Sequence, residues 1–193
     1  MNTMMRSNAG ISLVTPETRL FDKREIFITG EITDEVMCDF FQKMRVLIAE
    51  DADAPISIFL NSPGGEIRSG LAMYNMIASC KTEINIYVLA KAFSMAAVLL
   101  VAGKKGHRFL MPYSEVMIHE PLITSRVGGS TSSIRSISES LQESKELIDG
   151  ILVKHTGHSM EEVCKATGFD HYFKAEEAVE WGLADKIVEF CDM

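Results

Sequence analysis

Hydrophobic and polar residues alternate along the first two thirds of the chain in a way that is typical of strands and helices in turn. Runs rich in β-branched and aromatic residues predict strands at 25–29, 56–60, 84–89, 108–111 and 115–119. Apolar residues at helical spacing predict helices at 34–48, 66–79 and 94–102. Short links between these elements indicate stacked βαβ units, so we expect one α/β domain over residues 1–193.

The last third changes character after Gly128 and Gly129. A long helix is predicted from about 131 to 155, with Ser, Glu and Lys outside a single apolar stripe. The stripe consists of Ile134, Ile137, Leu141, Leu147, Ile148, Ile151 and Leu152. We expect this helix to project from its domain and bury the stripe against another subunit. The alternative is an amphipathic helix that lies on its own sheet.

Composition and charge narrow the range of partners. The net charge is −8, from 19 basic and 27 acidic residues, and no concentrated basic surface is predicted, so a nucleic-acid partner is not expected. The most hydrophobic stretch, 84–102, is interrupted by Lys91 and Ser94. A strand followed by a helix therefore fits it better than a membrane span, which needs about 20 mostly apolar residues.

The four cysteines are far apart and form no CxxC pair, so neither structural zinc nor a disulfide framework is expected. Residues 1–8 contain no apolar segment of a signal peptide. We expect reduced thiols, no metal and a cytoplasmic protein. The motifs GxxxxGK[ST], GxGxxG after a strand and HExxH are also absent, so no cofactor is expected.

Ser94 follows the strand predicted at 84–89 across a short turn and opens a helix of small and aliphatic residues. Free backbone N–H groups and the positive end of the helix dipole suit a nucleophile whose reaction develops an oxyanion. The competing interpretation is that Ser94 is only the helix N-cap, the most common use of serine at this position.

Two further features are ambiguous by themselves. Asn61–Gly65 places two glycines between a strand and a helix, which allows backbone N–H groups to face a cleft but also describes an ordinary turn. His119 ends an apolar strand and is either a general base or a packed polar residue. The other four histidines are expected to be structural or solvated: His107, His155, His158 and His171.

Together these residues resemble the Clp-type (caseinolytic) protease proteolytic subunit family from about Phe21 to Glu189. The resemblance rests on several ordered motifs: NSPGG at 61–65, SM at 94–95, AGxxGxR at 102–108, MIHxP at 117–121, HTG at 155–157, and AEEA with GLxD at 175–185. Motifs in this order and spacing form a far more specific signal than any one of them alone.

The resemblance implies a serine endopeptidase with a role for each matched residue. Ser94 is similar to the nucleophile, His119 to the general base and Asp170 to the carboxylate that orients the imidazole. The backbone N–H groups of Gly65 and Met95 are expected to form the oxyanion hole. Ile67 and Leu122 are expected to flank an extended substrate bound by strand addition.

The family fold is a crotonase-like ββα spiral with a projecting handle helix, here about 131–155, and an N-terminal axial segment, here 1–20. The resemblance implies heptameric rings stacked in pairs as a homo-oligomeric tetradecamer. It also implies unfolded polypeptide delivered by a separate ring-shaped AAA+ ATPase unfoldase, for protein quality control. The missing P-loop agrees with that division of labour.

Three departures from the family pattern concern assembly. Phe169 stands where the family commonly has an arginine that helps to join the rings, while Ser57 and Ser79 replace aromatic residues of the ATPase-docking groove. We therefore expect a sluggish peptidase that works best with a paralogous subunit. Two alternatives remain: a weakly active or inactive ring subunit, and a crotonase-like acyl-CoA enzyme.

Overall fold

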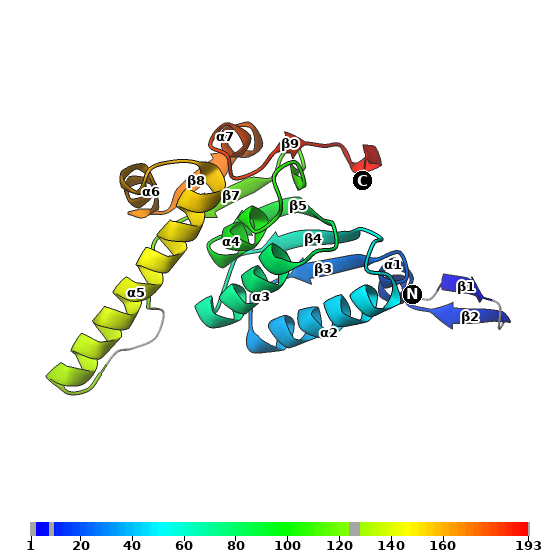
Figure 1. Cartoon of the computed structure of the whole chain (residues 1–193), viewed down its shortest axis with the longest axis horizontal. Helices are drawn as coiled ribbons and strands as arrows, with labels where there is room; N and C mark the ends of the chain where they lie inside the picture. Colours follow the sequence, from blue (N-terminus) through cyan, green and yellow to red (C-terminus); the bar gives the residue numbers. More distant parts are fainter. Residues whose placement is uncertain (1–2, 8–9, 124–127, 193) are drawn as a thin grey trace.

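The computed structural model describes residues 3–7, 10–123 and 128–192. Strands β1 (Thr3–Ser7) and β2 (Gly10–Val14) form an antiparallel hairpin, which is followed by helix α1 (Pro16–Phe21). The hairpin extends from one end of the molecule, away from the central sheet (Figure 1). The axial role expected for residues 1–20 stays a prediction.

The body is a mixed α/β fold around a mainly parallel seven-stranded sheet, as predicted. Its strands are β3 (Glu25–Thr29), β4 (Ile56–Ser62), β5 (Ile84–Phe93), β6 (Arg108–Leu110), β7 (Glu115–Ile118), β8 (His171–Lys174) and β9 (Lys186–Ile187). The order β3-β4-β5-β6-β9 is parallel throughout. The second half of β5 pairs with β7 in parallel, and β7 pairs with β8 in antiparallel fashion.

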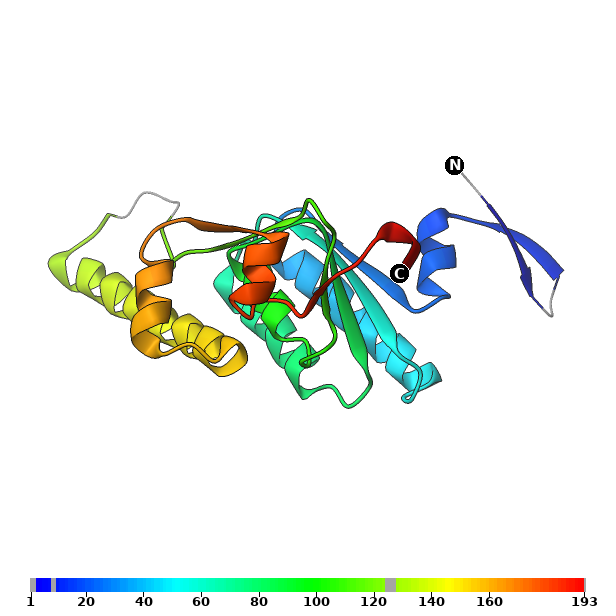
Figure 2. The same cartoon turned by 90° about the horizontal axis from the view of Figure 1, so that it is seen from above.

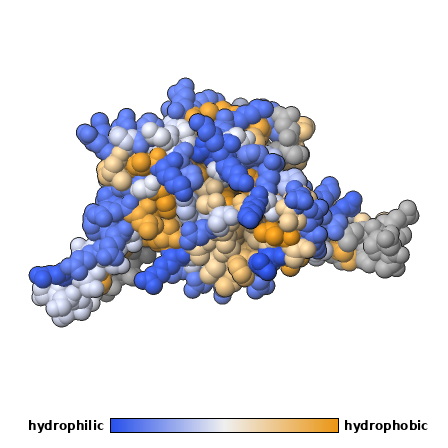
Figure 3. All heavy atoms as spheres, viewed as in Figure 1, coloured by the Kyte–Doolittle hydropathy of each residue, from blue (hydrophilic) through white to orange (hydrophobic). Residues whose placement is uncertain are grey.

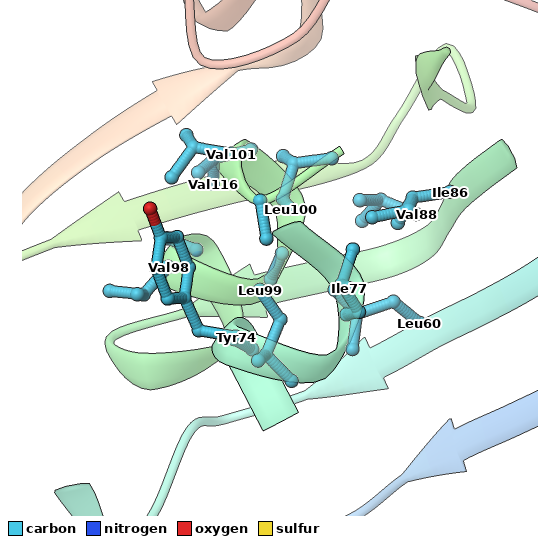
Figure 4. Packing of buried hydrophobic residues seen from close by; sticks show 14 of the residues in the cluster. Leu60, Tyr74, Ile77, Ile86, Val88, Val98, Leu99, Leu100, Val101 and Val116 are labelled. Carbon is cyan, nitrogen blue, oxygen red and sulfur yellow. The ribbon is translucent and has the colours of Figure 1, made fainter. Parts of the chain in front are cut away.

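Three helices pack against one another beside this sheet (Figure 1): α2 (Asp34–Glu50), α3 (Ile67–Ser79) and α4 (Met95–Val101). All seven residues of α4 are buried, because this helix lies at the centre of the hydrophobic core. Figure 4 shows its valines and leucines among Tyr74 and Ile77 of α3 and residues of β4, β5 and β7. Each buried aliphatic side chain contributes about 1.5–3 kcal/mol to stability.

A row of four stacked aromatic rings crosses the sheet. Phe27, Phe59, Tyr87 and Phe109 occupy matching register positions on β3, β4, β5 and β6. Successive ring centroids are 4.8, 5.3 and 4.9 Å apart. Since Ile26 and Ile28 are buried on the other face of β3, the row lies on the face opposite the core, and Phe27 is 39% exposed.

Helix α5 (Thr131–Thr156) matches the long helix predicted at about 131–155. Its C-terminal half packs on the body, with Ile148 and Leu152 buried, and it ends at Gly157 in the left-handed conformation. Its N-terminal half reaches past the body (Figure 2), and Ile134 is 50% exposed there. The C-terminal half of α5 thus packs on α4 of its own domain, and burial of the stripe against another subunit stays a prediction.

The chain continues through α6 (Met160–Thr167) and α7 (Ala175–Glu180) to a short 3-10 helix at Phe190–Asp192. Several predicted boundaries differ from the structure by one or two residues, and the largest difference is at β5, which extends to Phe93 instead of ending at Leu89. Residues 91–93 are not a turn, because they pair with β7, a partner that lies more than twenty residues later. Across the described ranges, no helix is long and apolar enough to cross a bilayer.

Candidate active site

Ser94 lies at the junction of β5 and α4 in an unusual backbone conformation, with φ 54° and ψ −122°. A non-glycine residue in such a region costs on the order of 1–3 kcal/mol and is held there by its surroundings. One restraint is the hydrogen bond from the Ser94 N–H to the Met117 carbonyl, at 2.8 Å. The Ser94 side chain makes no capping hydrogen bond, so the interpretation as a simple N-cap is not supported.

The Ser94 hydroxyl is instead paired with His119, which follows the last residue of β7. The distance from His119 Nε2 to Ser94 Oγ is 2.9 Å, and that from His119 Nδ1 to Asp170 Oδ1 is 3.0 Å. The imidazole therefore bridges a hydroxyl and a carboxylate. Its side chain is 15% exposed, whereas that of Asp170 is 57% exposed.

Asp170 reaches this position through the pairing of β8 with β7. Ile118 and His171 are register partners, so the residues that follow β7 and precede β8 meet at the same end of the antiparallel pair. Helix α6, which leads to Asp170, begins with a capping box formed by Ser159 and Glu162. The β7–β8 pair and helix α6 thus bring His119 and Asp170 together, although the two residues are far apart in the sequence.

The glycine turn lies directly against Ser94. A Cβ atom on Gly64 would stand 2.6 Å from the Phe93 carbonyl oxygen and 2.8 Å from the Ser94 Cβ, so only glycine fits. Gly65, with φ 152°, forms a bridge to Ile32, where a Cβ would come within 2.6 Å of the Ile32 nitrogen. The backbone of 64–65 is thereby fixed beside the hydroxyl.

Met95 is the first residue of α4, and the N–H groups of a first helical turn have no acceptor within the helix. Gly65, Met95, Ser94 and His119 line the same cavity, which has a volume of about 810 Å³. The structure therefore places both predicted oxyanion-hole residues beside the predicted nucleophile.

The same cavity holds the two predicted substrate contacts, Ile67 at the start of α3 and Leu122 after β7. Leu122 is 54% exposed and accessible to a ligand. Val98 of α4 and Leu141 of α5 add apolar wall, and Figure 3 shows hydrophobic surface gathered between α5 and α3. Of the predicted site residues, Asp170 alone does not line this cavity; it contacts His119 from behind.

Two motif blocks that the sequence separates also meet in the structure. Arg108 donates to Asp185 from Nε at 2.9 Å and from Nη2 at 2.5 Å, and Arg108 is buried. Burial would raise the pKa of Asp185, but hydrogen bonds from Arg108, its positive charge and backbone N–H groups outweigh that effect and lower it. This ion pair connects the first residue of β6 with the residue that directly precedes β9.

His155 and His171 are partly buried and make structural contacts, which is one of the two roles expected for them. The Tyr74 hydroxyl lies 2.8 Å from His155 Nε2, and the His171 ring stacks on Phe173 at 4.2 Å. Burial, then the charges of Lys154 and Arg108, lower the pKa of His155. Sequence reasoning also missed the buried Asp149, whose only signal was its i,i+4 spacing from Lys145.

Within residues 3–7, 10–123 and 128–192, no three His, Cys, Asp or Glu side chains are grouped to hold a metal ion. The four cysteines are free thiols. The cavity presents the Ser94 hydroxyl and the His119 imidazole, and the Asp170 carboxylate contacts the imidazole from outside the cavity.

A family model described as Clp protease matches residues 8–190 of the 193 residues. The matched range includes the glycine turn, the Ser94 junction, the His119 strand and the β8 segment. That family consists in general of serine peptidase subunits that form rings and work with Clp ATPases. Because the match covers nearly the whole chain, the chain belongs to the Clp protease family.

Proposed function

We propose that this chain is a serine endopeptidase subunit in which Ser94, His119 and Asp170 act as a triad. Ser94 Oγ attacks the scissile carbonyl while His119 Nε2 takes its proton and later gives it to the leaving amine. A water then hydrolyses the acyl-enzyme with the same imidazole as base. The observation that carries the proposal is the imidazole placed 2.9 Å from the hydroxyl and 3.0 Å from the carboxylate.

The surrounding residues give this mechanism its electrostatic and binding support. The N–H groups of Gly65 and Met95 hold the oxyanion of the tetrahedral intermediate, and removal of one such donor typically costs about 10²–10³-fold in kcat. Asp170 keeps the imidazole in the productive tautomer and stabilises its charged form. Ile67 and Leu122 flank an extended, unfolded polypeptide that adds as a strand.

We further propose that the chain assembles into two stacked heptameric rings in the cytoplasm, where an AAA+ ATPase unfoldase delivers the substrates. The exposed stripe on the N-terminal half of α5 provides an apolar surface for contact between copies. The row of rings from Phe27 to Phe109 supplies apolar area for docking of the ATPase.

A second candidate is a weakly active ring subunit that supports a more active paralogue. The observation that favours it is Phe169, which is 65% exposed directly before Asp170 and offers no charge to an opposite ring. The acyl-CoA alternative has less support, because the family match is to proteases and Ser94 with His119 would then have no role.

A fluorophosphonate probe separates these candidates, since it forms a covalent bond only with an activated serine. Incubation of the purified protein, followed by mass spectrometry of its peptides, is expected to locate the adduct on Ser94. The Ser94→Ala and His119→Ala variants should remain unlabelled, and exposed Ser138 is an internal control that should never react. A wild-type protein without an adduct on Ser94 contradicts the active peptidase.

A further inference from the structure

We propose that Asp149 is a positioning residue that holds His119 and Asp170 in register from within helix α5; this inference rests on the proposed function. Its side chain is 2% exposed, whereas the charged residues Glu146 and Lys154 of the same helix are exposed. A buried carboxylate is costly unless it is paired, so its surroundings indicate what it stabilises.

Three donors from two elements converge on the Asp149 carboxylate. Lys145 Nζ lies 2.9 Å from Oδ2, the Thr167 hydroxyl donates to Oδ1 at 3.0 Å, and the Cys164 thiol donates to Oδ2 at 3.4 Å. Lys145 is on the same helix, whereas Cys164 and Thr167 belong to α6. The Asp149 node, defined as Asp149 with Lys145 and Thr167, therefore fastens α6 to α5.

From this node one connection leads to the carboxylate of the triad. Thr167 is completely buried and is the last residue of α6, three positions before Asp170. Only Gly168 and Phe169 separate Thr167 from Asp170, so the position of the C-terminal end of α6 restricts the position of Asp170. An anchored Thr167 thus limits the movement of a side chain that is itself 57% exposed.

A second connection leads to the base. The N–H of Glu120, the residue after His119, donates to the Thr167 carbonyl at 2.7 Å. Lys145 Nζ also lies 3.5 Å from Glu120 Oε2. Glu120, which follows His119, and Thr167, which lies three positions before Asp170, are therefore both part of or bonded to the Asp149 node. Displacement of Thr167 would move the two triad members relative to each other.

The size of the effect follows from the sensitivity of catalysis to geometry. A misplacement of about 1 Å can cost about 10²-fold in rate. Asp149→Asn keeps the shape and one acceptor oxygen but removes the charge that Lys145 faces. We expect this variant to lower kcat about 10–100-fold. KM should change less than about 2-fold, because Asp149 does not line the substrate cavity.

The split between kcat and KM provides a readout that a purely structural role would not move. If Asp170 is displaced, it no longer orients the imidazole, so kcat should fall while the residues that line the substrate cavity, and therefore KM, are retained. Tyr74→Phe is the matched control: it removes the hydrogen bond to His155 near the end of the same helix without touching the node. It should lower thermal stability but leave kcat and KM unchanged.

Because Asp149→Asn could also weaken folding, a second variant keeps the test decisive. The double replacement Asp149→Leu with Lys145→Met exchanges a buried ion pair for apolar groups of similar size, which is often neutral or stabilising. Stability should then be close to wild type, while kcat remains reduced. All variants are measured as assembled particles isolated by size-exclusion chromatography.

The outcomes separate this inference from the proposed function. Wild-type labelling at Ser94 with unchanged kcat in both Asp149 variants overturns the positioning role alone. A wild-type protein without turnover or labelling overturns the proposed function, and the positioning role falls with it. Reduced kcat with an unchanged KM in the stable double variant supports the inference.

Discussion

At the scale of the residue, two non-glycine residues in the described part of the chain have positive φ, Arg24 and Ser94, and they differ in what holds them. The Arg24 guanidinium donates to four backbone carbonyls, those of Pro55, Leu47, Asp51 and Ala54, which explains its conformation by local bonding. Ser94 has no such set of side-chain bonds; its hydroxyl contacts His119. The strained residue is thus the one that faces the cavity.

Asp170 provides a test of the third triad position. Asp170→Asn preserves the shape of the side chain but removes its charge and leaves His119 Nδ1 facing an amide. We expect kcat for a fluorogenic peptide to fall about 10³–10⁴-fold, with little change in KM. Asp185→Asn is not a suitable control because that carboxylate is a structural partner of Arg108, so exposed Asp53→Asn serves instead. A loss of less than a few-fold would assign the orienting role to another residue.

His155 predicts a pH dependence of stability. Its pKa in the folded protein is below the ordinary value of 6.5, mainly because of burial. The unfolded chain therefore binds a proton that the folded protein resists, so the free energy of unfolding should fall as the pH drops below about 6.5. Urea unfolding between pH 5 and pH 8 measures this slope in the wild type and in His155→Gln. The variant should show a shallower slope, and identical slopes would contradict the prediction.

At the scale of the element, helix α5 has two halves with different environments. Ile148 and Leu152 are buried in the core, whereas Ile134 and Ile137 are 50% and 36% exposed. A helix that buries its C-terminal half and exposes an apolar N-terminal stripe is suited to contact between copies. The same helix carries Asp149, so one element serves the core, the site and the proposed assembly.

A charge placed on that stripe should weaken ring stacking. Ile137→Asp or Leu141→Asp introduces an unpaired charge that costs several kcal/mol wherever the stripe is covered in the assembly. Sedimentation velocity should show smaller particles for both variants. Gln142→Asp places the same charge on an exposed position beside the stripe and should leave the particle size unchanged. If all three variants form the wild-type particle, the contact between copies lies elsewhere.

Most elements could be predicted because local pattern determines them. The strand at Glu25–Thr29 matches its predicted bounds, and the long helix differs by one residue, since alternation and helical spacing are visible within single segments. The extension of β5 to Phe93 could not be predicted because its cause, pairing with β7, is a distant contact. Lys91 in an apolar run resembles a turn when that partner is unknown.

The residues of the site also divide into those with a local signal in the sequence and those without one. Ser94 at a strand–helix junction and the glycines of 61–65 have local signals, yet both also fit ordinary caps and turns. The carboxylate could be selected only by family resemblance, because Asp170 lies 51 residues from His119 and many acidic residues compete. The aromatic row and the Asp149 node depend on register and on helix packing, which no single segment reveals.

At the scale of the whole molecule, the surfaces proposed for assembly and for ATPase docking lie on different parts of the structure. The stripe of α5 is at one end, and the aromatic row crosses the face of the sheet that the core helices do not cover (Figure 1). Ser57 lies beside Glu25 and Asn85 in the register of the sheet and adds little apolar area to the row, and exposed Ser79 adds none. Burial of a Phe-sized side chain contributes about 1.5–3 kcal/mol.

These surfaces predict a pure chain that is slow and binds its ATPase weakly. Serines in place of two aromatics reduce the docking area, and Phe169 cannot form an ion pair with an opposite ring. Peptide turnover and particle size should both increase when a paralogous ring subunit with the usual arginine is added. Brisk turnover by a homogeneous double ring, together with tight ATPase binding, would show instead a self-sufficient protease.

Hydrolysis of a fluorogenic peptide by purified wild-type protein and by Ser94→Ala tests the central claim most directly. The substitution deletes the hydroxyl 2.9 Å from His119 and leaves a small residue at the start of α4. We predict measurable wild-type turnover and loss of nearly all of it in Ser94→Ala, since removal of a triad member costs several orders of magnitude in kcat. Particle size should be unchanged, and Ser138→Ala should behave as wild type. A Ser94→Ala protein that keeps more than a few per cent of wild-type activity would contradict the account.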